Sequence, residues 1–169
     1  ALALLGSMPS LCFEPDVIIC NGAVSACRKG AQWLSALALL GAMGRLRLQP
    51  DVITCNSAIS ACQKGGQWLS ALALLGAMGR LRLQPDVITC NSAISACEKG
   101  GEWPAALAIL GSMAALQVDP NVISYSAAMS ACEKGSQWEL ALSILGSMAD
   151  AQIRPNVISC SAAISACEK

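Results

Sequence analysis

Cysteine is the residue type in this sequence best suited to chemistry, and nine of its ten copies recur at fixed spacing; Cys12 stands apart. The nine fall into two columns of a 35-residue repeat: Cys20, Cys55, Cys90 and Cys160, and Cys27, Cys62, Cys97, Cys132 and Cys167. Within a repeat the two cysteines are seven residues apart, which on a helix separates them by about 10 Å. A disulfide joins Cα atoms roughly 4.4–6.8 Å apart. We therefore exclude disulfides within a repeat.

Metal binding by these cysteines is equally disfavoured. Structural zinc sites use closely spaced pairs such as CxxC and commonly histidine, and the sequence contains no histidine. We interpret the cysteines as small hydrophobic residues buried between stacked helices, and we predict no metal and no cofactor. Ten thiols also favour a reducing compartment.

Two other features bear on function. One tryptophan per repeat, at Trp33, Trp68, Trp103 and Trp138, serves either as a stacking platform for bases or as packing at a helix junction, and we favour packing. The chain has no Gly-rich phosphate loop and no asymmetric cluster of carboxylates, so the sequence does not predict an enzyme.

The cysteine and tryptophan columns share one spacing because the whole sequence is repeated. Leu34–Cys62 recurs unchanged as Leu69–Cys97, and such a fixed period is typical of a stacked array. We predict one array over 1–169, with full repeats at 17–51, 52–86, 87–121 and 122–156 and partial repeats at 1–16 and 157–169. Because both termini fall inside a repeat, we expect the chain to be part of a longer array.

Each repeat is predicted to contain two helices. The first runs from the opening Val to the Lys before a Gly, and that Gly supplies the left-handed residue that helix ends prefer. The second begins at the Trp, and a Pro ends the connector that follows. The predicted fold class is all-α: an α-α superhelix, or right-handed solenoid of helix-turn-helix repeats.

The composition excludes disorder and a membrane span. Apolar residues make up 54% of the chain, too many for a disordered protein. The longest apolar stretch, 33–44, has 12 residues, whereas a membrane helix needs roughly 20. We expect no membrane partner.

Taken together, the 35-residue period, the openings PDVITCN and PNVISYS, the following AISACEKG and the helix ALAILGSM resemble the pentatricopeptide repeat family, in its 35-residue P-type form. Tetratricopeptide repeats, which bind peptides, have a period of 34. The resemblance implies single-stranded RNA binding at one nucleotide per repeat. It also implies a role in organellar RNA processing or stabilisation, with other RNA-processing proteins as partners. A mitochondrial or plastid location rests on this resemblance alone.

The family resemblance also implies which residues read bases: the fourth after the opening Val, paired with the last residue of the repeat. The pairs are Asn21 with Asp51, Asn56 with Asp86, Asn91 with Asn121, and Ser126 with Asn156. Asp16 and Ser161 belong to the partial repeats.

Hydrogen-bonding chemistry makes this pairing sensible. An ionised Asp only accepts hydrogen bonds, which suits the ring N–H of uracil or guanine, whereas Asn can also donate to cytosine or adenine. Asn as the first partner leaves room for a pyrimidine, and the shorter Ser leaves room for a purine. The predicted core is 5′-U-U-C/U-A-3′.

Two further columns complete the implied site. Base-sandwiching isoleucines follow each opening Val: Ile18, Ile53, Ile88, Ile123 and Ile158. Phosphate-contacting lysines close each first helix: Lys29, Lys64, Lys99, Lys134 and Lys169. The alternatives are that the isoleucines are plain core and that the lysines only complement helix dipoles.

The net charge of zero is the main argument against RNA, because phosphate contacts usually dominate affinity. The alternative function is an α-solenoid scaffold for protein–protein interaction. A third possibility, which the identical copies allow, is a decayed or recently duplicated array without a ligand.

Overall fold

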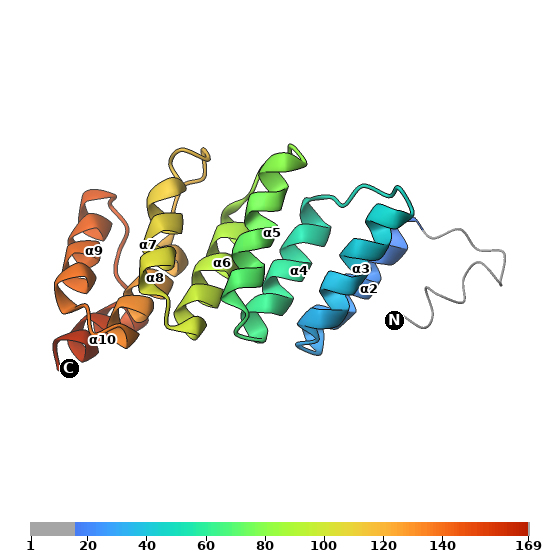
Figure 1. Ribbon diagram of the computed structural model, residues 1–169. Coiled ribbons are helices and arrows are strands. Elements are labelled where there is room, and N and C mark those ends of the chain that lie inside the picture. The colour runs from blue at the N-terminus through green and yellow to red at the C-terminus, as the bar shows by residue number, and fades with distance from the viewer. Residues whose placement is uncertain (1–15, 169) are drawn as a thin grey trace. The chain divides into compact units, whose positions relative to one another are not determined.

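The computed structural model describes residues 16–168, which form nine α-helices and no strand (Figure 1). The first helices of the repeats are α2 (Val17–Lys29), α4 (Val52–Lys64), α6 (Val87–Gly100), α8 (Val122–Lys134) and α10 (Val157–Cys167). The second helices are α3 (Trp33–Arg45), α5 (Trp68–Arg80), α7 (Trp103–Ser112) and α9 (Trp138–Asp150). The first helices begin at the predicted Val and the second helices at the predicted Trp.

The chain divides into two compact units, Ala1–Gln84 and Pro85–Lys169. In the first unit α2 packs against α4, and α3 contacts both of them, while α5 contacts α4. In the second unit α8 packs between α6 and α10, and α7 and α9 each contact two of these first helices. Within each unit, first helices thus pack directly against one another, and second helices pack across them. This helix-pair packing confirms the predicted all-α repeat solenoid.

Small side chains allow the helices to pack closely. In the first unit the core gathers Val24, Cys27, Leu39 and the alanines Ala58 and Ala61, all buried. Methionines are fully buried in both units, Met43 and Met78 in the first and Met113, Met129 and Met148 in the second. Flexible methionines and small alanines suit a core that has few aromatic residues.

The position of the left-handed residue differs from the sequence prediction. Gly30, Gly65 and Gly135 follow the lysines with φ between −86° and −84°, in the ordinary right-handed range. The left-handed residue is the next one along, at Ala31, Gly66, Gly101 and Ser136. The helical hydrogen bonding continues through the first Gly, and the left-handed residue then lets the following N–H bond back to the cysteine carbonyl, as Gln67 does to Cys62 at 2.9 Å.

The first Gly of these turns has a different role, which is to make room for a tryptophan of the preceding repeat. A Cβ at Gly65 would lie 2.5 Å from Cδ1 of Trp33, and a Cβ at Gly135 would lie 2.2 Å from Cδ1 of Trp103. Each of these tryptophans therefore packs on the end of the next first helix in its own unit. This contact agrees with the packing interpretation for Trp33 and Trp103, whereas Trp138 of the same column is exposed.

Candidate functional site

The described cysteines offer little thiol chemistry. Seven of the nine are buried, and burial raises the pKa of Cys62, Cys97 and Cys132 to about 11. Thiols with such a pKa stay protonated near neutral pH and are poor nucleophiles and metal ligands. No group of three or more His, Cys, Asp and Glu side chains within residues 16–168 is arranged to hold a metal ion.

Two cysteines depart from the burial expected from the sequence. Cys160 and Cys167 are exposed, although Cys132 in the same column as Cys167 is buried. The difference follows from packing, because α8 lies between two first helices while α10 contacts α8 and α9. Cys12 lies outside the described residues.

The first predicted base-reading pair, Asn21 and Asp51, is brought together at the N-terminus of α4. Asn21 Nδ2 donates to Asp51 Oδ2 at 3.0 Å. The other carboxylate oxygen, Oδ1, accepts the backbone N–H of Thr54 at 2.8 Å and so caps α4. The Thr54 hydroxyl accepts the backbone N–H of Asp51 at 3.1 Å and also contacts Asn21 Oδ1.

These bonds hold Asp51 in its ionised form. Burial alone raises the pKa of this carboxyl group, but the hydrogen bonds from Thr54 and Asn21 outweigh burial and lower the pKa below its ordinary value of 3.8. At neutral pH Asp51 is therefore an acceptor only, with Oδ1 used by the helix and Oδ2 facing Asn21.

The third pair repeats this arrangement with an amide in place of the carboxylate. Asn121 caps α8 through Oδ1, which accepts the backbone N–H groups of Ile123 and Ser124 at 3.0 and 3.1 Å. Asn91 Nδ2 lies 3.3 Å from the same oxygen, and the Ser124 hydroxyl donates to Asn91 Oδ1 at 2.6 Å. Because Oδ1 serves the helix, the Nδ2 end of Asn121 is the end left for a ligand.

In the fourth pair the first member is Ser126, which carries a hydroxyl in place of the Asn amide. Ser126 lies 3.3 Å from Asn156 Oδ1 and 2.7 Å from the carbonyl of Val122, which is the closer acceptor for its single proton. Asn156 caps α10 by accepting the backbone N–H of Ser159 at 2.8 Å. As in the third pair, the cap leaves Nδ2 as the outward group.

The structure does not test the pairing of the remaining predicted base-reading residues, and each is described by itself. Asn56 lies on α4 in the first unit and Asp86 caps α6 in the second, so their pairing stays a prediction from sequence. Asp16 is exposed and caps α2 through the backbone N–H of Ile19 at 2.7 Å. Ser161 is exposed on α10.

Sequence reasoning missed that the last residue of each repeat, the second member of each predicted base-reading pair, is also a helix N-cap. The signal was present, because each Asp or Asn stands directly before the opening Val, and Thr or Ser occurs three residues later in four of the five cases. The same residue therefore fixes a helix and presents a polar group, which ties the position of that group to the backbone.

The isoleucine column is on the surface and does not belong to the core. Exposure runs from 56% at Ile123 to 78% at Ile18, which excludes the plain-core alternative for this column. In the second unit a pocket of about 230 Å³ opens between α6, α8 and α10, and Ile123, Ser126, Asn156 and Ile158 are among its lining residues. The fourth pair thus lies in a hollow with an exposed isoleucine from each of two successive repeats.

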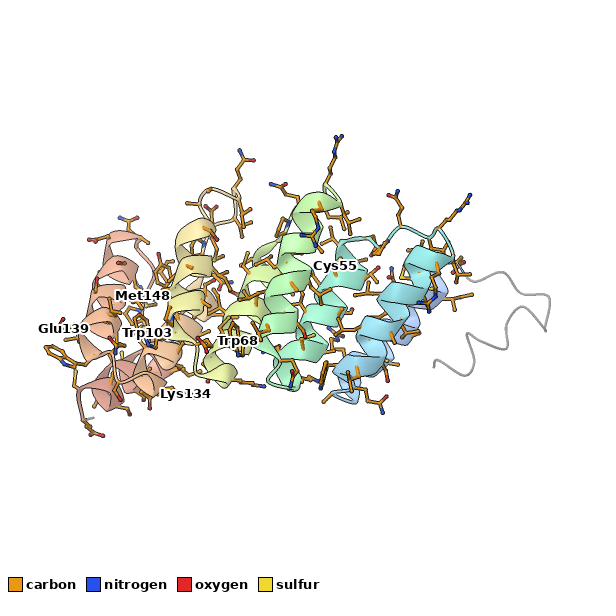
Figure 2. All side chains as sticks on the ribbon, in the orientation of Figure 1. Cys55, Trp68, Trp103, Lys134, Glu139 and Met148 are labelled. Atoms are coloured by element: carbon orange, nitrogen blue, oxygen red, sulfur yellow. The ribbon has the colours of Figure 1, made fainter. Side chains whose placement is uncertain are left out.

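The lysine column is exposed at Lys29, Lys64, Lys99 and Lys134, and Lys169 lies outside the described residues. Lys134 (labelled in Figure 2) forms an ion pair with Glu98, with Nζ 2.5 Å from Oε1. Glu98 also lines the pocket, so one candidate phosphate contact is already neutralised by a carboxylate at the site.

A second pocket lies elsewhere in the same unit. It has a volume of about 480 Å³ between α9 and α10, and its lining is mostly apolar, including Leu142, Leu145 and Ile164. None of the predicted base-reading residues lines it.

None of the helices between residues 16 and 168 has the length and apolar character that crossing a membrane requires.

Comparisons with known proteins agree on one family. The profile described as "PPR repeat" matches residues 53–83 and 123–153, and that described as "Pentatricopeptide repeat domain" matches 73–135. Together the matches run from 53 to 153, more than half of the 169 residues. None of the curated proteins matches the chain.

Similar folds occur among solved structures. The pentatricopeptide repeat protein PPR10 from maize has a TM-score of 0.83 and 21% identity over 98% of this chain, and its complex with an 18-nt psaJ RNA element has a TM-score of 0.77 at the same identity and coverage. The chain spans 24% of PPR10. The PPR domain of Arabidopsis thaliana protein-only RNase P 1 in complex with tRNA has a TM-score of 0.76 and 16% identity, covering 86% of this chain and 77% of that domain.

Proposed function

Because the chain belongs to the pentatricopeptide repeat family, we propose that it binds single-stranded RNA and reads its sequence one nucleotide per repeat. The proposed core is 5′-U-U-C/U-A-3′, read in order by the four full repeats. Similar proteins were solved with RNA bound, namely PPR10 with an 18-nt element and the PPR domain of protein-only RNase P 1 with tRNA.

The pocket at the fourth pair is the observation that carries this proposal. A base inserted there would lie between the exposed side chains of Ile123 and Ile158, with its edge toward Ser126 and Asn156. Unstacked bases in single-stranded RNA are recognised in this way, by contacts on their faces and hydrogen bonds on their edges.

Helix capping explains how Asp and Asn come to select different bases. In the first repeat Asp51 offers only acceptor oxygens, and Asn21 Nδ2 keeps one N–H beyond its bond to Asp51. An acceptor beside a donor complements the ring N–H and the neighbouring carbonyl of uracil. The Asn21 side chain leaves space for a pyrimidine but not for guanine.

The third and fourth repeats present a donor instead. The caps of α8 and α10 use the amide oxygens of Asn121 and Asn156, so Nδ2 faces the ligand and can donate to the ring acceptor of cytosine or adenine. The small Ser126 side chain, already bonded to its own helix, leaves room for the larger adenine.

Selection of RNA from a randomised single-stranded pool by the full chain tests the proposal. Enrichment of UUCA or UUUA is the expected result, and a register shifted by one repeat would contradict the assignment of the pairs. A flat selection by a folded protein would favour the scaffold alternative, for which the apolar pocket between α9 and α10 is the surface to examine.

Family membership also supports a role in RNA processing or stabilisation in mitochondria or plastids, alongside other RNA-processing proteins. Imaging of the tagged protein in cells tests the location, and a uniform cytosolic distribution would contradict it. We propose no catalytic step for this chain.

A further inference from the structure

A column of buried hydroxyl groups lies next to the base-reading pairs and belongs to none of them. The column is the third residue of four of the first helices, Thr54, Thr89, Ser124 and Ser159; the same place in α2 holds Ile19, which has no hydroxyl. Thr54 and Ser124 are fully buried, so neither hydroxyl is placed to contact RNA directly. Each nevertheless bonds to a reading residue of the preceding repeat, 33 residues earlier in the chain.

The hydrogen-bond pattern determines where the hydroxyl proton goes. Thr54 Oγ1 accepts the backbone N–H of Asp51 at 3.1 Å, and Ser124 Oγ accepts that of Asn121 at 3.1 Å. One proton remains to be donated by each hydroxyl. For Ser124 the amide oxygen of Asn91, at 2.6 Å, is closer than the cap oxygen of Asn121 at 3.2 Å. Thr54 Oγ1 contacts the amide oxygen of Asn21 and also lies 2.8 Å from the cap oxygen of Asp51, so these two oxygens share its proton.

This bond fixes which end of the amide faces the second reading residue. With Oδ1 held by the hydroxyl, Nδ2 of Asn21 points to Asp51 Oδ2 at 3.0 Å, and Nδ2 of Asn91 points to Asn121 Oδ1 at 3.3 Å. The two ends of an amide have nearly the same size but opposite hydrogen-bonding character. Rotating the amide by half a turn would exchange donor and acceptor at the base without changing the shape of the site.

We propose that Thr54 and Ser124 are positioning residues that set the base preference of the preceding repeat by holding the orientation of Asn21 and Asn91. The proposal deepens the RNA-binding function proposed above and rests on it. Base choice by a repeat with Asn as first reader then depends on three side chains, one of which lies inside the following repeat.

The fourth repeat shows why this buried hydroxyl is needed only where the first reading residue is Asn. Its first reader, Ser126, has no amide to orient, and its hydroxyl is held by its own helix. Correspondingly, Ser159 Oγ makes its bonds with Asn156, at 2.8 Å to N, 2.9 Å to O and 3.0 Å to Oδ1, within its own helix cap.

The variants Thr54→Val and Thr54→Ser of the full chain test the proposal by selection from a randomised RNA pool. Thr54→Val should reduce the preference for uracil by about fivefold at the position read by the first repeat, the effect of losing one hydrogen bond. The positions read by the third and fourth repeats should keep their preferences. Thr54→Ser restores the hydroxyl and should restore the preference.

Ser124→Ala provides the reciprocal measurement, with loss of preference at the third position and none at the first. Uniform loss at all positions, or no loss in a folded Thr54→Val variant, would overturn the proposal. Circular dichroism establishes that each variant is folded.

Ser159→Ala is the matched control for helix capping. It removes a hydroxyl that accepts the N–H of its cap residue, as Thr54→Val does, but this hydroxyl bonds no amide of a first reader. The fourth position should therefore keep its preference for adenine. An equal loss there would show that capping, and not amide orientation, sets base choice.

Side-chain ¹⁵N relaxation of the free protein separates this proposal from the RNA-binding function. The Asn21 and Asn91 side-chain amides should be as rigid as the backbone, and Thr54→Val should mobilise Asn21 alone. A mobile Asn21 in the unaltered protein would overturn the positioning role even if RNA binds. Rigid amides with a flat RNA selection would preserve the positioning geometry and refute the RNA-binding function.

Discussion

The two compact units are built from the same kind of helix pair and carry opposite net charge. Residues 1–84 carry seven basic and three acidic residues, whereas residues 85–169 carry four basic and eight acidic residues. The net charge of zero is therefore the sum of +4 in the first unit and −4 in the second. The overall neutrality that argued against RNA describes neither unit by itself.

The units also differ in the groups that cap their helices. Asp16 and Asp51 cap α2 and α4 in the first unit, whereas the second unit uses Asp86 at α6 and Asn121 and Asn156 at α8 and α10. The contacts that build the repeat are the same in both, since a tryptophan packs on the next glycine in each unit. The comparison teaches that repeat packing is kept while net charge and helix-cap residues vary around it.

Exchanging Asp and Asn at the helix caps should have the largest effect on base preference. Asp51→Asn turns an acceptor into a donor and should shift the first base from U toward C, and Asn156→Asp should shift the fourth base from A toward G. Both caps remain competent, so folding should be preserved. The expected change in discrimination is about 1–3 kcal/mol per base, measured by fluorescence anisotropy with RNAs that differ at one position.

Asp16→Asn is the matched control for this exchange. It makes the same chemical change at the cap of α2, before the first full repeat, and should leave preferences at the four positions unchanged. Unchanged preference in Asp51→Asn and Asn156→Asp would remove the cap residues from the reading site.

Substituting the glycine under each tryptophan tests whether the two units share their packing. Gly65→Ala and Gly135→Ala should each lower the free energy of unfolding by about 1–3 kcal/mol, because the new methyl group overlaps the indole of Trp33 or Trp103. The loss should be greater for Gly135, where the contact is closer. Urea unfolding followed by circular dichroism measures both values.

Gly76→Ala and Gly111→Ala are the controls, one in each unit. Both positions are helical and open, with nothing within 4 Å of an added Cβ, so alanine should raise stability by up to about 1 kcal/mol. A destabilised control, or a neutral Gly135→Ala, would contradict the packing role.

Acid should affect the Asp51 cap and spare the Asn caps. Hydrogen bonds depress the pKa of Asp51 in the folded state, so its stabilising contribution is present above the unfolded value near 4 and is lost as the pH falls through the folded pKa. The free energy of unfolding of the unaltered chain should therefore fall more steeply below about pH 4 than that of Asp51→Asn. Parallel pH profiles of the two proteins would show that Asp51 does not contribute.

The smallest effect concerns the charge of the second unit. Glu98→Gln should free Lys134 from its ion pair and increase RNA affinity by about 0.2–1 kcal/mol, the usual range for an exposed pair. The affinity should also fall more steeply with salt, by about one unit of slope. Glu139→Gln on α9 (labelled in Figure 2) makes the same change in charge at a residue that does not line the pocket, and it is the control. Equal effects of the two variants would indicate general electrostatics and no role for the Glu98–Lys134 pair.

Much of the fold could be predicted because the relevant signals are local. Val opens each first helix and Trp each second helix, and both recur at the 35-residue period. Pro104 lies in the first turn of α7, where a residue without a backbone N–H is tolerated. The left-handed residue was misplaced by one position, because the length of the last helical turn depends on a hydrogen bond that the identity of the glycine does not reveal.

The candidate site was predictable in part. The resemblance to the family supplied the pairs, and the structure brings Asn21 to Asp51, Asn91 to Asn121, and Ser126 to Asn156. The family resemblance did not supply the roles of Thr54 and Ser124. A Thr or Ser at the third position of a helix looks like an ordinary helix-start residue. The ion pair of Glu98 with Lys134 was also missed, since the two residues are 36 positions apart.

The sequence alone determined the repeat, the residue at which each helix begins and the chemical identity of the groups each repeat can present. These depend on periodicity, capping residues and turns, which act over a few residues. Only the tertiary structure decided which end of each amide faces outward, which glycine a tryptophan covers and which lysine is neutralised. Those outcomes depend on side chains 30 to 36 residues apart that meet when successive repeats pack, and a distance of a few tenths of an ångström decides which hydrogen bonds form.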